Sequence, residues 1–197
     1  MRFTIYDGVY TLEKVLYLAD SRIRGVYVST WGEGDTALRK VVSILCGRKL
    51  IAVNQEPLAH NYGSYYRITP LGKLYLKLSQ KRFAQENKGD YEGMYTGRGA
   101  PDFFRFNEGA RDALGIETTT LAYDAFGEDM YEQVGALLAL IGAGASFVTR
   151  EHKPAIKIMN QLTLKKKAEG GETTITALGL ILFNEMRENA IREVELS

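Results

Sequence analysis

Apolar residues recur every three or four positions along several stretches of the chain, which is typical of amphipathic helices. Two such stretches predict the first helix of two similar segments: Leu12, Val15, Leu16 and Ala19, and then Val134, Leu137, Leu138 and Ile141. At 197 residues the chain is long enough for one large core or two small ones, so its length does not decide between them.

A second pair of apolar stripes predicts a central helix in each segment. The first stripe follows the capping candidate Asp35 and stops near Gly47. Its members, and those of its counterpart at a constant offset of 117 residues, are Leu38, Val41, Val42 and Leu45, and Ala155, Ile158, Met159 and Leu162. In this register Lys40 falls on Lys157 and Ser43 on Asn160.

Each central helix precedes a predicted hairpin and then a third helix. Residues 50–53 are expected to pair with 65–68, and residues 165–168 with 172–175. The strand "YYRI" continues into "TPLGKLYL", and "TTI" continues into "TALGLILF", 107 residues later. Thr69 and Thr176 are placed to cap the helices that follow, and Pro70 suits a first helical position.

Both segments therefore have the order helix, short undefined element, helix, hairpin, helix, and we interpret the chain as a tandem duplication. The predicted fold class is α+β, mainly α. The expected domains are residues 1–88 and 131–197, joined by an aromatic- and glycine-rich connecting segment at 89–130.

This order, with Ile68, Thr69, Pro70 and Gly72 opening the third helix and "ILCGRKLIAV" before the hairpin, resembles the winged-helix domains of MarR-like and PadR-like proteins. The resemblance covers most of residues 11–82 and, more faintly, 131–188. The second copy departs from it at Ala177, which replaces the proline, and at Leu164, which stands where the first copy has Gly47. Both copies also leave room for only one or two turns of the usual second helix.

The resemblance implies a tandem pair of winged helices of the helix-turn-helix type that bind double-stranded DNA, with the central helix in the major groove and the hairpin against the backbone or minor groove. The candidate DNA-binding residues are polar positions off the apolar stripes and at the hairpins: Thr36, Arg39, Lys40, Ser43, His60, Asn61, Tyr62, Lys153, Lys157, Asn160, Gln161, Lys165, Lys166 and Lys167. Lys and Arg suit phosphate or guanine, and Asn and Gln suit adenine. The same residue types are also ordinary on a solvated helix face or a strand edge.

Charge is unevenly distributed, although the formal net charge is only +1. Residues 36–88 contain ten Lys or Arg and two acidic residues, and residues 150–167 contain six and one. Residues 107–132 contain one basic and seven acidic residues. Two basic blocks flank an acidic one, which is compatible with a polyanionic partner.

No catalytic or metal-binding pattern is recognisable, so we expect neither an enzyme nor a cofactor. His60 and His152 lack the spacing of a zinc site, and Cys46 is interpreted as a packing residue of the central helix. The single cysteine fits a reducing compartment. The N-terminus lacks the apolar core of a signal peptide, and the longest uncharged run, 133–149, is too short to span a membrane, so a cytoplasmic protein without a membrane partner is expected.

The connecting segment is rich in aromatic residues, which we expect to pack between the copies or in a homodimer interface. These are Tyr91, Tyr95, Phe103, Phe104 and Phe106, and base stacking is the alternative. The function predicted is DNA binding in transcription regulation. Replication initiation or partition would use the same parts, and a winged-helix module for protein interaction is the alternative from another class.

Overall fold

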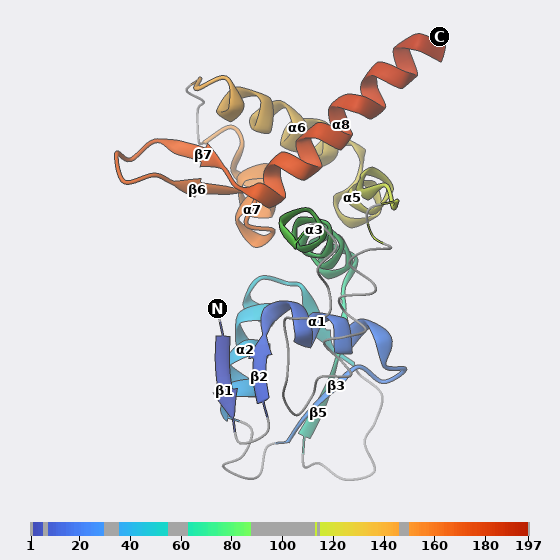
Figure 1. Cartoon of the computed structure of the whole chain (residues 1–197), viewed down its shortest axis with the longest axis vertical. Helices are drawn as coiled ribbons and strands as arrows, with labels where there is room; N and C mark the ends of the chain where they lie inside the picture. Colours follow the sequence, from blue (N-terminus) through green and yellow to red (C-terminus); the bar gives the residue numbers. More distant parts are fainter. Residues whose placement is uncertain are drawn as a thin grey trace. The chain divides into compact units, whose positions relative to one another are not determined.

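The computed structural model describes residues 2–5, 8–29, 36–54, 63–87, 113, 115–145 and 150–196. The chain divides into two compact units, Met1–Leu114 and Gly115–Ser197 (Figure 1). It is mainly helical with small antiparallel sheets, so the predicted class, α+β and mainly α, is confirmed. The aromatic residues Tyr91 to Phe106 of the connecting segment lie outside the described residues.

The first unit places two helices against a small sheet. Its elements are β1 (Arg2–Ile5), β2 (Gly8–Thr11), α1 (Leu12–Ser21), β3 (Val26–Ser29), α2 (Thr36–Gly47), β4 (Ile51–Val53), β5 (Gly63–Ile68) and α3 (Pro70–Asn87). Strands β1 and β2 pair with each other, and the other three form an antiparallel sheet in the order β3-β5-β4. Helix α1 contacts α2, α3 and the sheet.

The second unit repeats this order with one helix in front. Its elements are α5 (Thr118–Phe126), α6 (Glu128–Gly142), α7 (Lys153–Gln161), β6 (Lys165–Lys167), β7 (Thr173–Ile175) and α8 (Ala177–Leu196). Strands β6 and β7 form an antiparallel hairpin that projects from the helices of this unit (Figure 1). Both predicted hairpins and all six predicted helices are confirmed among the described residues.

The predicted apolar stripes form the cores. Every stripe residue predicted for α1, α2 and α6 is buried, and Val15, Leu45 and Leu138 are completely inaccessible to solvent. In α7 the buried residues are Ala155 and Met159. Burial of a large aliphatic side chain contributes about 1.5–3 kcal/mol, so these stripes are the main source of stability in each unit.

A threonine at the start of α3 connects three elements of the first unit. The hydroxyl of Thr69 donates to the carbonyl oxygen of Lys49 (2.7 Å), and the Gly72 amide donates to the Thr69 hydroxyl oxygen (3.0 Å). The Thr69 amide donates to the carbonyl oxygen of Leu50 (3.0 Å). Thr69 therefore caps α3, as predicted, and also fixes the turn between α2 and β4.

Thr176 makes the same contacts in the second unit. Its hydroxyl donates to the carbonyl oxygen of Thr163 (2.6 Å) and accepts from the Gly179 amide (3.2 Å). Its amide donates to the carbonyl oxygen of Leu164 (3.0 Å). The duplication inferred from two short sequence signatures is thus present in the hydrogen bonds.

The turn after the central helix corrects the predicted register. In the first unit, three amides at positions 48, 49 and 50 donate to the carbonyl oxygens of residues 44, 46 and 45. In the second, the amides at 162, 163 and 164 donate to residues 158, 160 and 159. The offset is therefore 114 and not 117, so Arg39 corresponds to Lys153, Ser43 to Lys157 and Leu50 to Leu164.

Three elements were not predicted. β3 occupies part of the space considered for a second helix, and its sequence, Val-Tyr-Val-Ser, is typical of a strand. The hairpin of β1 and β2 flanks Asp7-Gly8, a common hairpin signal. α5 lies in the predicted connecting segment.

The division between the units differs from the predicted boundaries at 88 and 131, because α5 packs within the second unit. Glu185 of α8 accepts hydrogen bonds from the amide (2.8 Å) and the hydroxyl of Thr118, and Arg192 pairs with Glu117 (2.8 Å). Tyr123 of α5 stacks on Tyr131 of α6 with ring centroids 4.5 Å apart. These contacts tie α5 to α6 and α8, so the second unit begins at Gly115.

We predict that Gly72→Ala and Gly179→Ala each lower the free energy of unfolding by about 1–3 kcal/mol. A Cβ at either position would collide with a backbone carbonyl oxygen, that of Leu50 or that of Leu164. Chemical unfolding followed by circular dichroism measures the change. Gly47→Ala and Gly170→Ala are the matched controls, since a Cβ there meets nothing within 4 Å, and equal losses in all four variants would contradict the prediction.

We also predict that Thr163→Gly raises the free energy of unfolding by about 1 kcal/mol. Thr163 has a φ of 57°, a left-handed conformation that is unfavourable for a β-branched residue and free of steric cost for glycine. Its carbonyl oxygen remains available to Thr176. The urea midpoint measures the effect, with Thr174→Gly in β7 expected to move it the other way. A lowered midpoint for Thr163→Gly would contradict the assigned turn.

Candidate nucleic-acid interface

The predicted residues of α2 occupy two faces of the helix. Thr36 and Lys40 are exposed and lie one helical turn apart, on the side away from the core. Arg39 is half-buried and Ser43 is exposed, and both belong to a face that looks toward the sheet. The four residues are close together, but only Thr36 and Lys40 form a purely outward stripe.

The predicted residues of α7 share one helix but do not repeat the pattern of α2. Lys153, Lys157 and Asn160 are exposed, and Gln161 is half-buried. With the offset of 114, Lys153 stands at the position of Arg39, Pro154 at that of Lys40, and Asn160 at that of Cys46. Arg39 and Lys153 are therefore the one predicted pair of equivalent helix positions at which both copies carry a cation.

The hairpins differ more than the helices. His60, Asn61 and Tyr62 lie outside the described residues. In the second hairpin Lys165 is half-buried, whereas Lys166 and Lys167 are exposed. Side chains alternate along a strand, so Lys165 and Lys167 lie on one face of the hairpin and Lys166 on the other. The three lysines therefore cannot all contact one surface.

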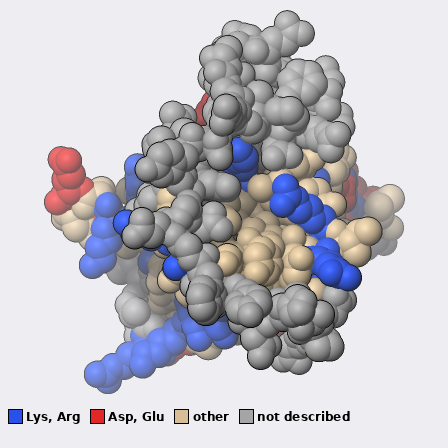
Figure 2. Space-filling model, turned by 90° about the horizontal axis from the view of Figure 1, so that it is seen from below, with Lys and Arg blue, Asp and Glu red and all other residues tan. Residues whose placement is uncertain are grey.

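The local charge of both helices is positive, since neither α2 nor α7 contains an acidic residue. Figure 2 shows Lys and Arg side chains at several places on the face seen from below, with few acidic side chains among the described residues there. Acidic residues are instead concentrated at the start of the second unit, where Glu117 is paired with Arg192. The helix faces could therefore accept phosphate without a nearby carboxylate on the same helix.

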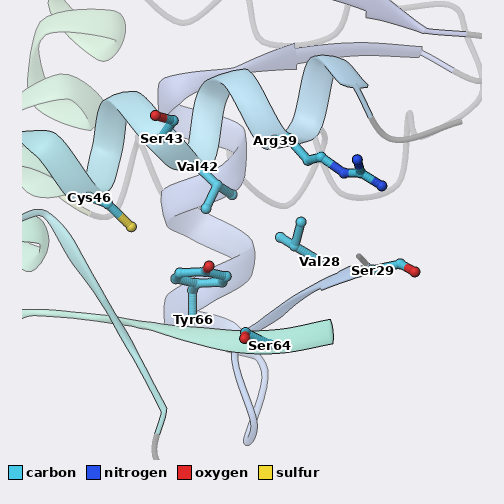
Figure 3. Close-up of a pocket in the computed structure, with 8 residues that line it drawn as sticks. All are labelled: Val28, Ser29, Arg39, Val42, Ser43, Cys46, Ser64 and Tyr66. Carbon is cyan, nitrogen blue, oxygen red and sulfur yellow. The ribbon is translucent and has the colours of Figure 1, made fainter. Parts of the chain in front are cut away.

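A groove of about 490 Å³ lies between α2 and the strands β3 and β5 (Figure 3). Arg39, Val42, Ser43 and Cys46, at i, i+3, i+4 and i+7, line one wall. Val42 points from this helix toward the ring of Tyr66, with Arg39 toward one end of the groove and Cys46 toward the other (Figure 3). The groove thus joins two of the predicted DNA-binding residues to an apolar cleft.

The opposite wall comes from strands whose importance the sequence did not reveal. Val28 pairs with Ser64 across β3 and β5, and Tyr66 lies two residues further along the same face of β5. Ser29 lies at the end of β3 and completes the lining. The only available signal was the β-branched and aromatic run at residues 26–28, which predicts a strand but not its partner.

Cys46 is the one residue of the groove with a perturbed ionisation. Burial raises the pKa of the Cys46 thiol above its usual value. The thiol therefore stays protonated at neutral pH and adds no negative charge to the groove. A protonated thiol is a poor nucleophile, which agrees with the interpretation of Cys46 as a packing residue.

Comparison with protein-family models, with curated proteins and with solved structures finds no match to this chain. Among the described helices, none has the length and apolar character to cross a membrane. Within the same parts of the chain, no cluster of three or more His, Cys, Asp or Glu side chains could bind a metal ion.

Proposed function

We propose that the protein binds double-stranded DNA through two winged-helix-like units and acts in transcription regulation. The observation that carries the proposal is the repeated arrangement of a central helix, a fixed turn and a hairpin, in which the central helix of each unit carries exposed cations and no acidic residue. A helix with such a face fits the major groove, and a hairpin beside it can reach the backbone.

The topology of the first unit supports the same proposal. Its order is α1, β3, α2, β4, β5 and α3, and the first of these strands adds to the hairpin through β5. A sheet attached to the end of the central helix orients that helix relative to the hairpin. The lack of a described helix between β3 and α2 distinguishes it from the usual helix-turn-helix pair, so docking is proposed for α2 itself.

The two units present different chemistry to DNA. In the first, Thr36, Arg39 and Lys40 lie near the start of α2, and in the second the cations extend from α7 to β6. Two unlike readers select two unlike half-sites, so we propose a target that is not a palindrome.

Two alternatives use the same parts. Replication initiation or partition requires the same DNA contact and differs only in the partner proteins recruited. A protein-interaction module without DNA binding is favoured by the modest net charge of +1. Titration of labelled duplex at several salt concentrations separates DNA binding from this module, because neutralising phosphates makes affinity fall steeply with salt.

We predict that Arg39→Ala with Lys40→Ala weakens duplex binding by about tenfold or more and reduces the slope of log affinity against log salt by about one per lost phosphate contact. Fluorescence anisotropy with duplex DNA measures both quantities. Neither side chain belongs to the buried stripe of α2, so circular dichroism should report an unchanged fold.

The matched control removes one arginine and one lysine elsewhere in the same unit. Arg24 and Lys73 are exposed, and neither lies on α2. Arg24→Ala with Lys73→Ala should leave the affinity within about twofold, apart from the weaker general effect of net charge. Equal losses in the two double variants, or no duplex binding by the unaltered protein at low salt, would overturn the proposal.

For the second unit we predict that Lys153→Ala weakens duplex binding more than Lys166→Ala. Lys153 is the counterpart of Arg39 on the central helix, whereas Lys166 is alone on its face of the hairpin. Each variant removes one lysine, so the two serve as charge-matched controls for each other in the anisotropy assay. A larger effect of Lys166→Ala would move the contact of this unit from α7 to the hairpin.

A further inference from the structure

We infer that the groove between α2 and the β3–β5 strands binds a small organic anion with a flat apolar body, and that this ligand competes with DNA. The binding part stands on the groove alone. The competition rests on the proposed function, because it requires α2 to contact DNA.

The size and lining of the groove fit a small molecule. Its volume of about 490 Å³ lies within the roughly 300–1,000 Å³ typical of ligand pockets. Val28, Val42 and the ring of Tyr66 supply an apolar interior (Figure 3). Such a wall favours a planar hydrocarbon or aromatic group, which can stack on the tyrosine.

The polar groups of the groove select the charge of the ligand. Arg39 carries the one formal charge among the eight lining residues, and Ser29, Ser43 and Ser64 add hydroxyl donors. A guanidinium group binds carboxylate, sulfonate or phosphate through paired hydrogen bonds. Since the Cys46 thiol is protonated, no negative charge of the lining opposes an anion.

The position of the groove couples the ligand to DNA. Arg39 and Ser43 line the groove and are also two of the four residues of α2 proposed to contact DNA. An anion that engages Arg39 occupies a side chain that DNA phosphates also require. By linkage, the ligand lowers the affinity for DNA by the same factor as DNA lowers the affinity for the ligand. Lys40, on the outward stripe, takes part only in the DNA contact.

The first test uses 1-anilinonaphthalene-8-sulfonate, an aromatic anion whose fluorescence rises in apolar surroundings, and its uncharged analogue N-phenyl-1-naphthylamine. We expect the full chain to bind the sulfonate about tenfold more tightly than the analogue, since a hydrogen-bonded charge is worth at least that factor. Arg39→Gln should remove this difference. Equal binding of the two probes, unchanged by Arg39→Gln, would contradict the anion assignment.

The second test fills the groove. Ser64→Phe places a ring between the walls and should reduce binding of both probes at least tenfold, whereas Thr174→Phe on β7, outside the lining, should not. Independently of any variant, the sulfonate should slow alkylation of Cys46, the single cysteine of the chain, by iodoacetamide. Probe binding that survives Ser64→Phe, or alkylation that proceeds at an unchanged rate with bound probe, overturns the site.

The third test separates this inference from the proposed function. Saturating sulfonate should lower the affinity for duplex DNA, and Lys40→Ala should weaken DNA binding while leaving the probe affinity unchanged. If the probe binds as expected and the unaltered protein binds no DNA, the proposed function fails and the groove remains a ligand site. If DNA binds and its affinity is insensitive to bound probe, the competition is wrong.

Discussion

The hydroxyl group of one threonine in each unit connects the elements on which the rest of the structure depends. Thr69 and Thr176 each donate to the carbonyl oxygen of a residue in a left-handed conformation, Lys49 or Thr163, and each caps the following helix through a glycine amide. The central helix, the first hairpin strand and the third helix therefore meet at one atom. A buried hydroxyl that lost these partners would cost about 1–3 kcal/mol, so the junction is specified by more than the packing of apolar stripes.

This junction explains why two glycines are required. The backbone of α3 and α8 approaches the carbonyl oxygens of Leu50 and Leu164 closely at Gly72 and Gly179, where any side chain would push the strands apart. Close approach brings the hairpin against the base of the central helix. The orientation of α2 and α7 relative to their hairpins, which any contact with a duplex would use, is thus a consequence of the Thr-x-x-Gly spacing.

The sequence was sufficient to predict the helices and hairpins, because their apolar stripes coincide with the buried residues. It was insufficient for the register between the copies. Apolar residues in a helix repeat every three or four positions, so a shift by three still matches Leu45 to an apolar residue, Leu162, instead of Met159. Only the backbone hydrogen bonds of the turn, which end at Leu50 and Leu164, distinguish 114 from 117. The groove was equally invisible, since it depends on β3 pairing with β5 across 37 positions (Val26 with Tyr66 is 40 apart, Ser29 with Gly63 is 34 apart).

The two copies show how a shared frame permits different surfaces. The junction residues Leu50, Thr69 and Gly72 recur unchanged as Leu164, Thr176 and Gly179, because their positions are set by backbone contacts. The outward positions have no such constraint, and there Val42, Ser43 and Cys46 correspond to Ile156, Lys157 and Asn160. Replacing Ser43 and Cys46 by a longer cation and an amide changes the wall that forms the groove in the first unit. A ligand that acts through Arg39 therefore addresses one unit and leaves the second to bind independently, so ligand would weaken two-site binding without abolishing contact by the second unit.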